Sequence, residues 1–128
     1  MLFRSVEKAK EAKQYIEFKF AIDSRLRGVT FTSIEGMNIY RTIQEAVNNS
    51  IKYADASTII IDIKQQTTAI EIIISDNGKG FDLTQTDLGN GINNMKKRIA
   101  DCNGSLDIIT NPNQGTTITI VINQNQMP

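Results

Sequence analysis

Histidine is absent from the 128 residues of this chain, tryptophan is absent too, and Cys102 is the only cysteine. The lack of histidine excludes a Ser-His-Asp triad, a Cys-His pair and a histidine-ligated zinc ion within the chain. A single cysteine excludes an internal disulfide and a cysteine-cluster metal site. Carboxylates, amides, lysines, arginines and backbone groups remain. They suit phosphate and Mg²⁺, because Mg²⁺ prefers oxygen ligands and phosphate binds N–H donors.

An excess of one charge and a long hydrophobic run are missing as well. Fourteen Lys and Arg balance fourteen Asp and Glu, so we expect no nucleic acid partner and no direct membrane contact, since both need clustered positive charge. No run approaches the ~18 apolar residues that span a bilayer, and the segment MLFRSVEKAK lacks the apolar stretch of a signal peptide. With 40% hydrophobic and 22% charged residues, the composition is that of one folded domain with its own core.

Apolar runs predict about five strands. The segment 15–23 alternates apolar and polar residues, which predicts a half-buried strand. Two isoleucine-rich runs, 57–65 and 69–76, are separated by a short polar turn and predict a hairpin. A second hairpin is predicted from 105–110 and 116–123, with the turn Asn-Pro-Asn-Gln-Gly between them.

Two helices are predicted between these strands. The longer begins at Thr32 or Ser33, where Glu35 can complete a capping box with Thr32, and it runs to about Ala54. The shorter covers 92–102. At 100° per residue, one side of the longer helix carries Ile39, Tyr40, Ile43, Ala46, Val47, Ser50, Ile51 and Ala54.

Together these elements predict an α+β fold, a two-layer sandwich in which a mixed sheet of about five strands has helices on one face. One domain is expected over 15–123. The polar segment 5–14 predicts an exposed helix, so 1–14 are expected to form a connecting helix from a further domain, and 124–128 predict a tail that frays.

The polar side of the longer helix carries Glu45, Asn49 and Lys52. Glu45 and Asn49 are i, i+4 neighbours and Lys52 lies about one turn further on, so we expect the three side chains to share one side of the helix. Such a side usually faces solvent and needs no other explanation. A Glu and an Asn at this spacing are also ligands that an octahedral Mg²⁺ accepts together with phosphate oxygens and water. The helix alone leaves both interpretations open.

Asp76 ends a predicted buried strand, and Asn77-Gly78-Lys79-Gly80 follows at once. A tight turn with positive φ accounts for two glycines this close, and the pattern is not a calcium loop, because Gly78 stands where a ligand residue belongs. A carboxylate at the end of a buried strand is costly without a partner. The exocyclic amine of adenine is one such partner, with Gly78 and Gly80 allowing the backbone to approach the base.

Two further glycine motifs lie next to predicted elements. The sequence Gly-Asn-Gly at 89–91 precedes the helix predicted over 92–102, and N–H groups at a helix start favour an anion. The sequence Gly-Thr-Thr at 115–117 leads into the last strand. Taken alone, the first motif is explained by an ordinary loop and the second by an ordinary hairpin turn. Neither motif matches a Rossmann fingerprint or a P-loop.

The order of these motifs resembles the GHKL family of ATP-binding domains, which includes gyrase, heat-shock chaperone, histidine kinase and mismatch-repair ATPases. YRTIQEAVNNSIKYA is similar to the N box of that family, DNGKGFD to its G1 box, GNGINNMKKRIADCNGSLDI to its G2 box and NQGTTITIVI to its closing Gly-Thr element. The resemblance covers about 15–123 and implies the Bergerat fold. Within the family, the short lid over 81–88 and the R-T-I-Q-E-A and N-M-K-K-R spellings are most similar to catalytic domains of bacterial sensor histidine kinases of the nitrate-sensor type.

The resemblance implies residues for the metal and the phosphates. Asn49 would coordinate the Mg²⁺ that bridges the phosphates of ATP, and Glu45 would support the metal through water or polarise an attacking group. Lys52 would contact phosphate. Gly89 and Gly91 would permit closure of the lid and present N–H groups to phosphate.

The resemblance also implies residues for the base. Asp76 would accept a hydrogen bond from the adenine amine, which favours adenine over guanine. Gly78 and Gly80 would shape the base pocket, and Thr116 would complete it. Tyr53 would pack on or near the nucleotide.

The implied function is that of the ATP-binding catalytic domain of a two-component sensor histidine kinase, which passes the γ-phosphoryl group of Mg-ATP to a histidine on a separate dimerisation domain. That domain and a response regulator with a helix-turn-helix output would be the partners, and the chain would lie in the cytoplasm as part of a membrane-bound sensor. The lid, 79–90, is expected to be mobile before nucleotide binds. Two alternatives of the same fold stay open: an anti-sigma-factor serine kinase, which would dimerise and bind a sigma factor, and a non-catalytic module that senses ATP.

Overall fold

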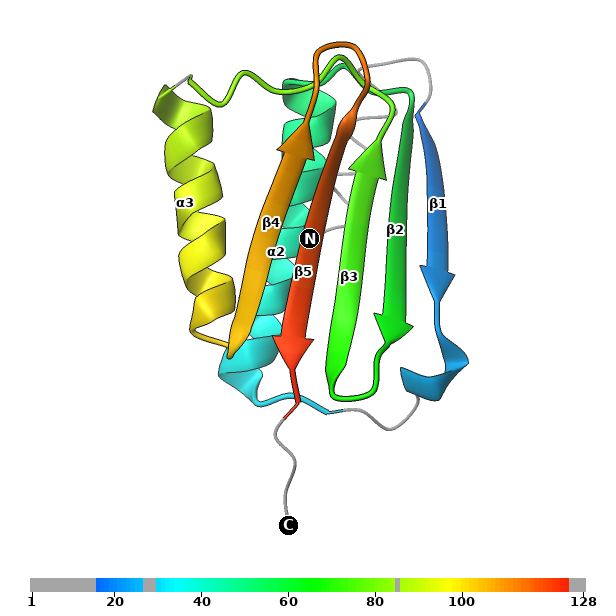
Figure 1. Ribbon diagram of the computed structural model, residues 1–128, viewed down its shortest axis with the longest axis vertical. Helices are drawn as coiled ribbons and strands as arrows, with labels where there is room; N and C mark the ends of the chain where they lie inside the picture. Colours follow the sequence, from blue (N-terminus) through cyan, green and yellow to red (C-terminus); the bar gives the residue numbers. More distant parts are fainter. Residues whose placement is uncertain (1–15, 27–29, 85, 125–128) are drawn as a thin grey trace.

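Five strands form one mixed sheet in the computed structural model, which describes residues 16–26, 30–84 and 86–124 (Figure 1). The strands are β1 (Glu17–Ile22), β2 (Thr58–Gln65), β3 (Ala69–Asp76), β4 (Gly104–Thr110) and β5 (Thr116–Asn123), and their order across the sheet is β1-β2-β3-β5-β4. β1 runs parallel to β2, and all other neighbours are antiparallel. The expected mixed sheet is confirmed. The connecting helix predicted over 1–14 and the tail residues 125–128 lie outside the described residues.

The helices α2 (Ser33–Lys52) and α3 (Thr86–Ala100) lie on the same side of this sheet (Figure 1), and the short 3-10 helix η1 (Ser24–Leu26) follows β1. α2 begins with the predicted capping box. The backbone N–H of Glu35 donates to Oγ1 of Thr32 at 3.1 Å, and the N–H of Thr32 donates to Oε1 of Glu35 at 2.9 Å. The expected α+β sandwich with helices on one face is therefore present.

α3 begins at Thr86, six residues before the predicted start at Ile92, so that prediction was wrong. The apolar stripe of the helix extends back to Leu88, which is 2% exposed and lies one turn before the buried Ile92. Burial of a leucine side chain contributes about 2 kcal/mol, which offsets the cost of about 1 kcal/mol for each of two glycines inside a helix. Gly89 and Gly91 therefore lie within α3 and do not open it.

The core lies between the sheet and the two helices. Isoleucines of β2, β3 and β5 alternate toward the helices, and the sheet register places Ile61 beside Ile74 and Ile72 beside Ile120. All four are buried. Since each fully buried isoleucine contributes about 1.5–3 kcal/mol, this isoleucine-rich layer is a main source of the stability of the fold.

β1 is less buried than its alternating pattern predicts. Ile16, which precedes the strand, is 3% exposed, but Phe20 and Ile22 further along are 56% and 67% exposed. Figure 1 shows the reason: α2 lies behind β4 and β5, α3 lies beside β4, and no described helix lies behind β1. An edge strand without a covering helix keeps its apolar side chains at the surface.

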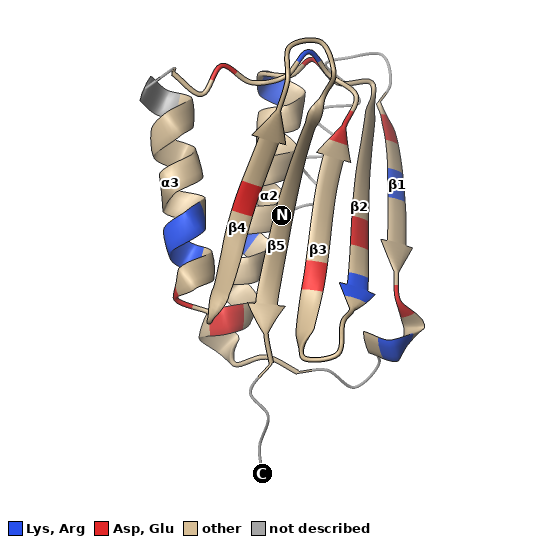
Figure 2. Ribbon diagram, in the orientation of Figure 1, with Lys and Arg blue, Asp and Glu red and all other residues tan. Residues whose placement is uncertain are grey.

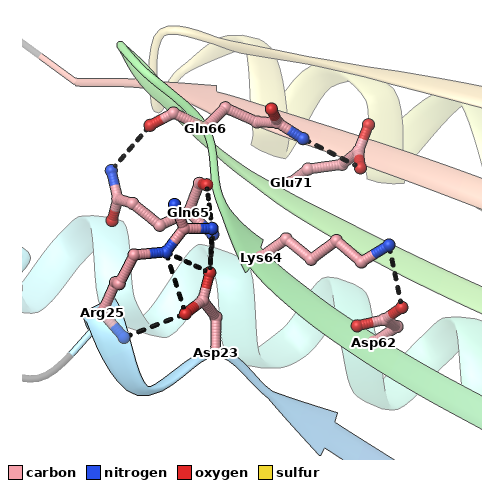
Figure 3. Close-up of polar contacts among 7 residues, drawn as sticks. All are labelled: Asp23, Arg25, Asp62, Lys64, Gln65, Gln66 and Glu71. Atoms are coloured by element: carbon pink, nitrogen blue, oxygen red, sulfur yellow. Dashed lines mark hydrogen bonds and ion pairs between the residues drawn. The ribbon is translucent and has the colours of Figure 1, made fainter.

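A polar cluster joins the end of β1 to the end of β2 (Figure 3). Oδ2 of Asp23 accepts hydrogen bonds from NH2 of Arg25 at 2.7 Å and from the backbone N–H of Gln65 at 3.1 Å. The same NH2 group also donates to the backbone oxygen of Gln65 at 3.2 Å. The side-chain hydrogen bond from Arg25 is the main cause that holds the pKa of the Asp23 carboxyl well below its usual value.

Replacing Asp23 by Asn is expected to lower the thermal unfolding midpoint at pH 7 and to change its pH dependence. A lowered pKa in the folded state means that the Asp23 carboxylate stabilises the fold fully above the ordinary value of 3.8, and that this contribution is lost as the pH falls below it. The difference between wild type and variant should therefore shrink between pH 4 and pH 2. Asp62→Asn, in the more open pair with Lys64, is the control. A difference of equal size at pH 7 and pH 2 would contradict this assignment.

Charged side chains are distributed over the helices and strands of the described residues (Figure 2). β3 and β4 show only red segments, α3 shows a blue segment, β1 and β2 show both colours, and no stripe of one sign runs across neighbouring elements in this view. None of the described helices has the length and apolar character needed to cross a membrane.

Candidate functional site

Three segments that are far apart in the sequence meet at one end of the sheet (Figure 1). They are the C-terminal end of α2, the loop that follows β3 and the tip of the β4–β5 hairpin. Backbone hydrogen bonds join them: the N–H of Lys79 donates to the oxygen of Ala54 at 2.8 Å, and the N–H of Asn113 donates to the oxygen of Lys79 at 2.9 Å. The loop after β3 is therefore fixed between the helix and the hairpin.

A cavity of about 590 Å³ opens between these segments. Its lining combines two lysines and an acidic residue with an aromatic wall: Lys52, Tyr53, Lys79, Gly80, Phe81, Asp82, Pro112 and Asn113. A second cavity of about 260 Å³ shares Lys79 and Asn113 with the first. The volume of the larger one is in the range of small-molecule sites, and its two lysines favour an anionic ligand.

Asp76 ends β3 next to these cavities. Its Oδ2 accepts a hydrogen bond from the hydroxyl of Ser50 on α2 at 2.7 Å, and its Oδ1 accepts from the backbone N–H of Gly78 at 2.8 Å. Asp76 is half-buried and does not line either cavity itself, whereas Gly78 lines the smaller one. Each carboxylate oxygen has a second lone pair, so the group can still accept a bond from a ligand.

Thr116 lies directly opposite Asp76 in the sheet register. Its side chain is buried, and its Oγ1 lies 3.0 Å from Oγ1 of Thr110, which in turn accepts the backbone N–H of Phe81 at 2.8 Å. This pair of hydroxyls connects the hairpin to the loop after β3. Sequence reasoning identified Thr116 but not Thr110.

The glycines of the loop after β3 allow close backbone packing. A Cβ on Gly78 would lie 2.3 Å from the backbone oxygen of Ala54. Gly80 has φ +84°, and a Cβ there would lie 2.6 Å from the oxygen of Asn111. Both glycines are therefore required by the contacts of the loop with α2 and with the hairpin.

Gly115 holds the hairpin against Asp76, and replacing it by Ala is expected to destabilise the fold by about 2–4 kcal/mol. Gly115 has φ +85°, and a Cβ would lie 2.1 Å from the backbone oxygen of Asp76. Urea unfolding followed by far-UV circular dichroism measures the change. Gly36→Ala is the control, because no atom of the described residues lies within 4 Å of a Cβ at that position of α2, and it should raise stability by up to about 1 kcal/mol. Equal stability of the two variants would contradict the assigned contact.

Glu45, Asn49 and Lys52 do not line one common cavity. Lys52 lines the 590 Å³ cavity, where its Nζ lies 5.1 Å from the centroid of the Tyr53 ring. Glu45 lines a different groove of about 380 Å³ between α2 and α3, where its Oε2 lies 3.1 Å from NH1 of Arg98. Asn49 is buried, with 8% exposure, although the helix pattern placed it on the polar side. The expectation that these three side chains act as one surface is thus only partly met.

The donors present fit a magnesium ion that takes most of its ligands from phosphate and water. The described residues contain no group of three or more acidic, cysteine or histidine side chains that could hold a metal alone. Nδ2 of Asn49 is buried and has no hydrogen-bond partner among the described residues. A buried polar group without a partner is unusual. As an N–H donor, Nδ2 cannot bind a cation, but it can donate to a phosphate oxygen, while Oδ1 of the same amide is the atom that could bind Mg²⁺.

Gly89 and Gly91 contact the rest of the site differently from what was expected. A Cβ on Gly89 would lie 3.4 Å from the oxygen of Leu83, and one on Gly91 would lie 2.8 Å from Oε1 of Glu45. Because α3 begins at Thr86, its free N–H groups belong to its first four residues. The N–H of Gly91 lies beyond that turn and is not available to an anion in this conformation.

The second half of the segment expected to be a mobile lid is helical, since 86–90 belong to α3. In the first half, Asp82 and Thr84 form a local turn in which the Thr84 hydroxyl and N–H both donate to Oδ1 of Asp82. These hydrogen bonds hold the pKa of the Asp82 carboxyl below its usual range.

Ser50 is the contact to Asp76 that sequence reasoning missed. It lies on the side of α2 that otherwise carries apolar residues, and a buried hydroxyl there needs a hydrogen-bond partner. That mismatch was a usable signal. Pro112 and Asn113, at the tip of the hairpin, gave no such signal, because their place at the cavity depends on contacts over long sequence distances.

Comparison with known families adds an independent result. Residues 35–126 match the family described as "Histidine kinase-, DNA gyrase B-, and HSP90-like ATPase". The chain is 41% identical over 97 residues to the signal transduction histidine-protein kinase/phosphatase DegS of Brevibacillus brevis. That alignment covers 75% of this chain and 25% of DegS, so the chain spans about a quarter of the length of this relative.

Solved structures share the fold at low sequence identity. The histidine kinase domain of the blue-light activated kinase EL346 of Erythrobacter litoralis matches 95% of this chain and 58% of its own, with a TM-score of 0.74 and 15% identity. The mycobacterial sensor histidine kinase MprB matches 98% of this chain and 93% of its own, with a TM-score of 0.68 and 18% identity. These similarities confirm the architecture predicted from the sequence motifs.

Proposed function

The chain belongs to the histidine kinase-, DNA gyrase B- and HSP90-like ATPase family, and from this premise we propose that it is the ATP-binding catalytic domain of a two-component sensor histidine kinase. It binds Mg-ATP and donates the γ-phosphoryl group to a histidine of a separate dimerisation domain. The observation that carries the proposal is the Asp76 carboxylate, which Ser50 and Gly78 hold at the start of the loop whose Gly78 lines the smaller cavity and whose Lys79 lines both cavities.

In this proposal the base and the phosphates have separate partners. Asp76 accepts the adenine amine with its remaining lone pairs, Gly78 and Gly80 hold the loop that borders the base, and Thr116 completes this part of the site. Tyr53 provides an apolar surface for the nucleotide, since its half-buried ring lines the larger cavity.

Lys52 and Lys79, both lining the larger cavity, supply positive charge for the phosphates. Asn49 would hold the Mg²⁺, and Glu45 would support the ion through water or polarise the attacking group during transfer; the ion, when bound, would offset negative charge of the phosphates. Gly89 and Gly91 let the start of α3 move when the lid closes over the nucleotide. That closure would have to change the helix start, because the N–H of Gly91 is inside α3 here.

The phosphoryl acceptor must come from elsewhere, because the chain contains no histidine. A ring nitrogen of the acceptor histidine forms a bond to the γ-phosphorus, the bond from that phosphorus to the bridging oxygen breaks, and ADP leaves. The dimerisation domain would supply this histidine, and a response regulator with a helix-turn-helix output would receive the group next. A cytoplasmic place within a membrane-bound sensor and the short-lid, nitrate-sensor-like subfamily belong to the same proposal.

Isothermal titration of the chain with ATP, with and without Mg²⁺ and with GTP as control, tests nucleotide binding. We expect binding of ATP that Mg²⁺ tightens, and no comparable binding of GTP. Transfer from labelled ATP to the part of B. brevis DegS outside the matched segment then tests the kinase class. Phosphohistidine is lost in acid, whereas a phosphate that survives acid would indicate a serine kinase. A folded chain that binds no ATP would overturn the proposal.

A further inference from the structure

The carboxylate of Glu45 reaches from α2 to α3 and meets that helix at both oxygens. Oε2 lies 3.1 Å from NH1 of Arg98, which donates a hydrogen bond to it. Oε1 lies where a side chain of residue 91 would stand, since a Cβ built on Gly91 would be 2.8 Å away. The missing side chain of Gly91 thus leaves the space that the carboxylate occupies.

Gly91 and Arg98 lie on the same side of α3. They are seven positions apart, which is about two turns of an α-helix. One side of α3 therefore offers Glu45 an open position at Gly91 and a guanidinium at Arg98. We call these two residues the Glu45 seat.

The Arg98–Glu45 pair is too open to be explained by stability alone. Both side chains are about one-third exposed, at 33% and 32%, and they line the groove of about 380 Å³ together with Arg41, Gln44 and Asn48. Ion pairs that contact solvent contribute little to folding, because water and salt screen them. The clearer physical effect of the pair is on the direction of the Glu45 carboxylate, which the hydrogen bond from Arg98 restricts.

We propose that Arg98 is a positioning residue, which orients the Glu45 carboxylate for phosphoryl transfer while Gly91 gives that carboxylate room. This inference rests on the proposed function, in which Glu45 assists transfer one helical turn from Asn49. Glu45 and Arg98 are 53 residues apart in sequence, and α3 includes the second half of the segment proposed to close over the nucleotide. The contact of Glu45 with the Glu45 seat therefore connects the side of α2 that carries Glu45 to the helix that includes part of the lid.

Steady-state phosphoryl transfer by the full chain to the DegS acceptor fragment, with Mg-ATP, tests the proposal. Arg98→Gln should lower kcat about tenfold or more while the KM for ATP stays within about threefold, because a reorienting contact acts on the transition state and not on nucleotide binding. Arg98→Lys should restore most of the rate, since an ammonium group can reach one carboxylate oxygen. Gly91→Ala should give the same loss of kcat by displacing the carboxylate.

Two matched variants show whether the effect is specific. Arg41→Gln removes the other cation that lines the same groove, and Lys97→Gln removes the exposed cation next to Arg98 on α3. Both should retain the kcat of the wild type. If they lose as much activity as Arg98→Gln, the effect is one of general charge and the proposal is wrong.

A double-mutant cycle with Glu45→Gln and Arg98→Gln, measured as kcat, tests whether the two residues act together. If Arg98 acts through Glu45, the double variant should lose no more kcat than Glu45→Gln alone, whereas fully additive losses would overturn the proposal. A wild-type chain that binds ATP but transfers nothing would overturn the proposed function and this inference together. That outcome is distinct, because the wild type then fails along with the variants.

Discussion

Asp76→Asn is expected to weaken ATP binding about 10- to 100-fold, the range that corresponds to losing one hydrogen bond to a charged acceptor. The single oxygen of the Asn side chain would continue to accept the N–H of Gly78, as Oδ1 of Asp76 does at 2.8 Å. The amide nitrogen would then face the side from which the adenine amine approaches. Two donors would oppose each other where a donor now meets a carboxylate.

The fold of the Asp76→Asn variant should survive. The hydroxyl of Ser50 donates to Oδ2 of Asp76 at 2.7 Å, and a hydroxyl can rotate to accept a hydrogen bond from an amide instead. Titration calorimetry with ATP gives the affinity, and thermal unfolding gives the stability. Asp107→Asn, an exposed position on β4, is the control and should bind ATP as the wild type does. Unchanged affinity in the folded Asp76 variant would refute the adenine role.

Asn49→Ala is expected to abolish the effect of Mg²⁺ on ATP binding. In the wild type, Mg²⁺ should lower the Kd for ATP by about tenfold or more, since the ion takes ligands from both the protein and the phosphates. Asn49 is the buried amide on α2 whose Oδ1 is proposed to bind the ion. Without that side chain, the Kd measured with Mg²⁺ should equal the Kd measured with a chelator.

Asn48→Ala is the matched control for Asn49. Asn48 precedes Asn49 in the chain, but it is exposed and lines the groove beside Glu45, so its variant should keep the full response to Mg²⁺. A folded Asn49→Ala chain that still binds ATP more tightly with Mg²⁺ would remove Asn49 from the metal site. In that case Glu45 would be the remaining side-chain ligand of those proposed.

Local features of the fold were predictable from the sequence. The capping box of Thr32 and Glu35 was predicted from residues three positions apart, and each hairpin from two runs and one turn. The start of α3 was missed because two glycines within three residues are more typical of a loop. Burial of Leu88 against the core, a tertiary effect, outweighs that preference.

Site residues that belong to one short motif could be predicted from the sequence. Contacts between residues that are far apart in the sequence could not. The positions of Asp76, Gly78 and Gly80 follow from one short segment at the end of a strand. The hydrogen bond of Ser50 to Asp76 joins residues 26 positions apart, and that of Arg98 to Glu45 joins residues 53 positions apart. No local pattern encodes such pairs, because they depend on how α2 packs against β3 and α3.

The insertion of β5 between β3 and β4 has a consequence for folding. The β2–β3 and β4–β5 hairpins are local, but Asp76 and Thr116 become neighbours only when β5 pairs with β3. Nucleotide bound across that junction would stabilise only the state in which both hairpins are docked. At an ATP concentration 100 times its Kd, this linkage amounts to about 2.7 kcal/mol. In a cell rich in ATP, part of the free energy that keeps the two hairpins paired would then come from bound ATP. Depletion of ATP would lower the stability of the domain as well as stop its activity.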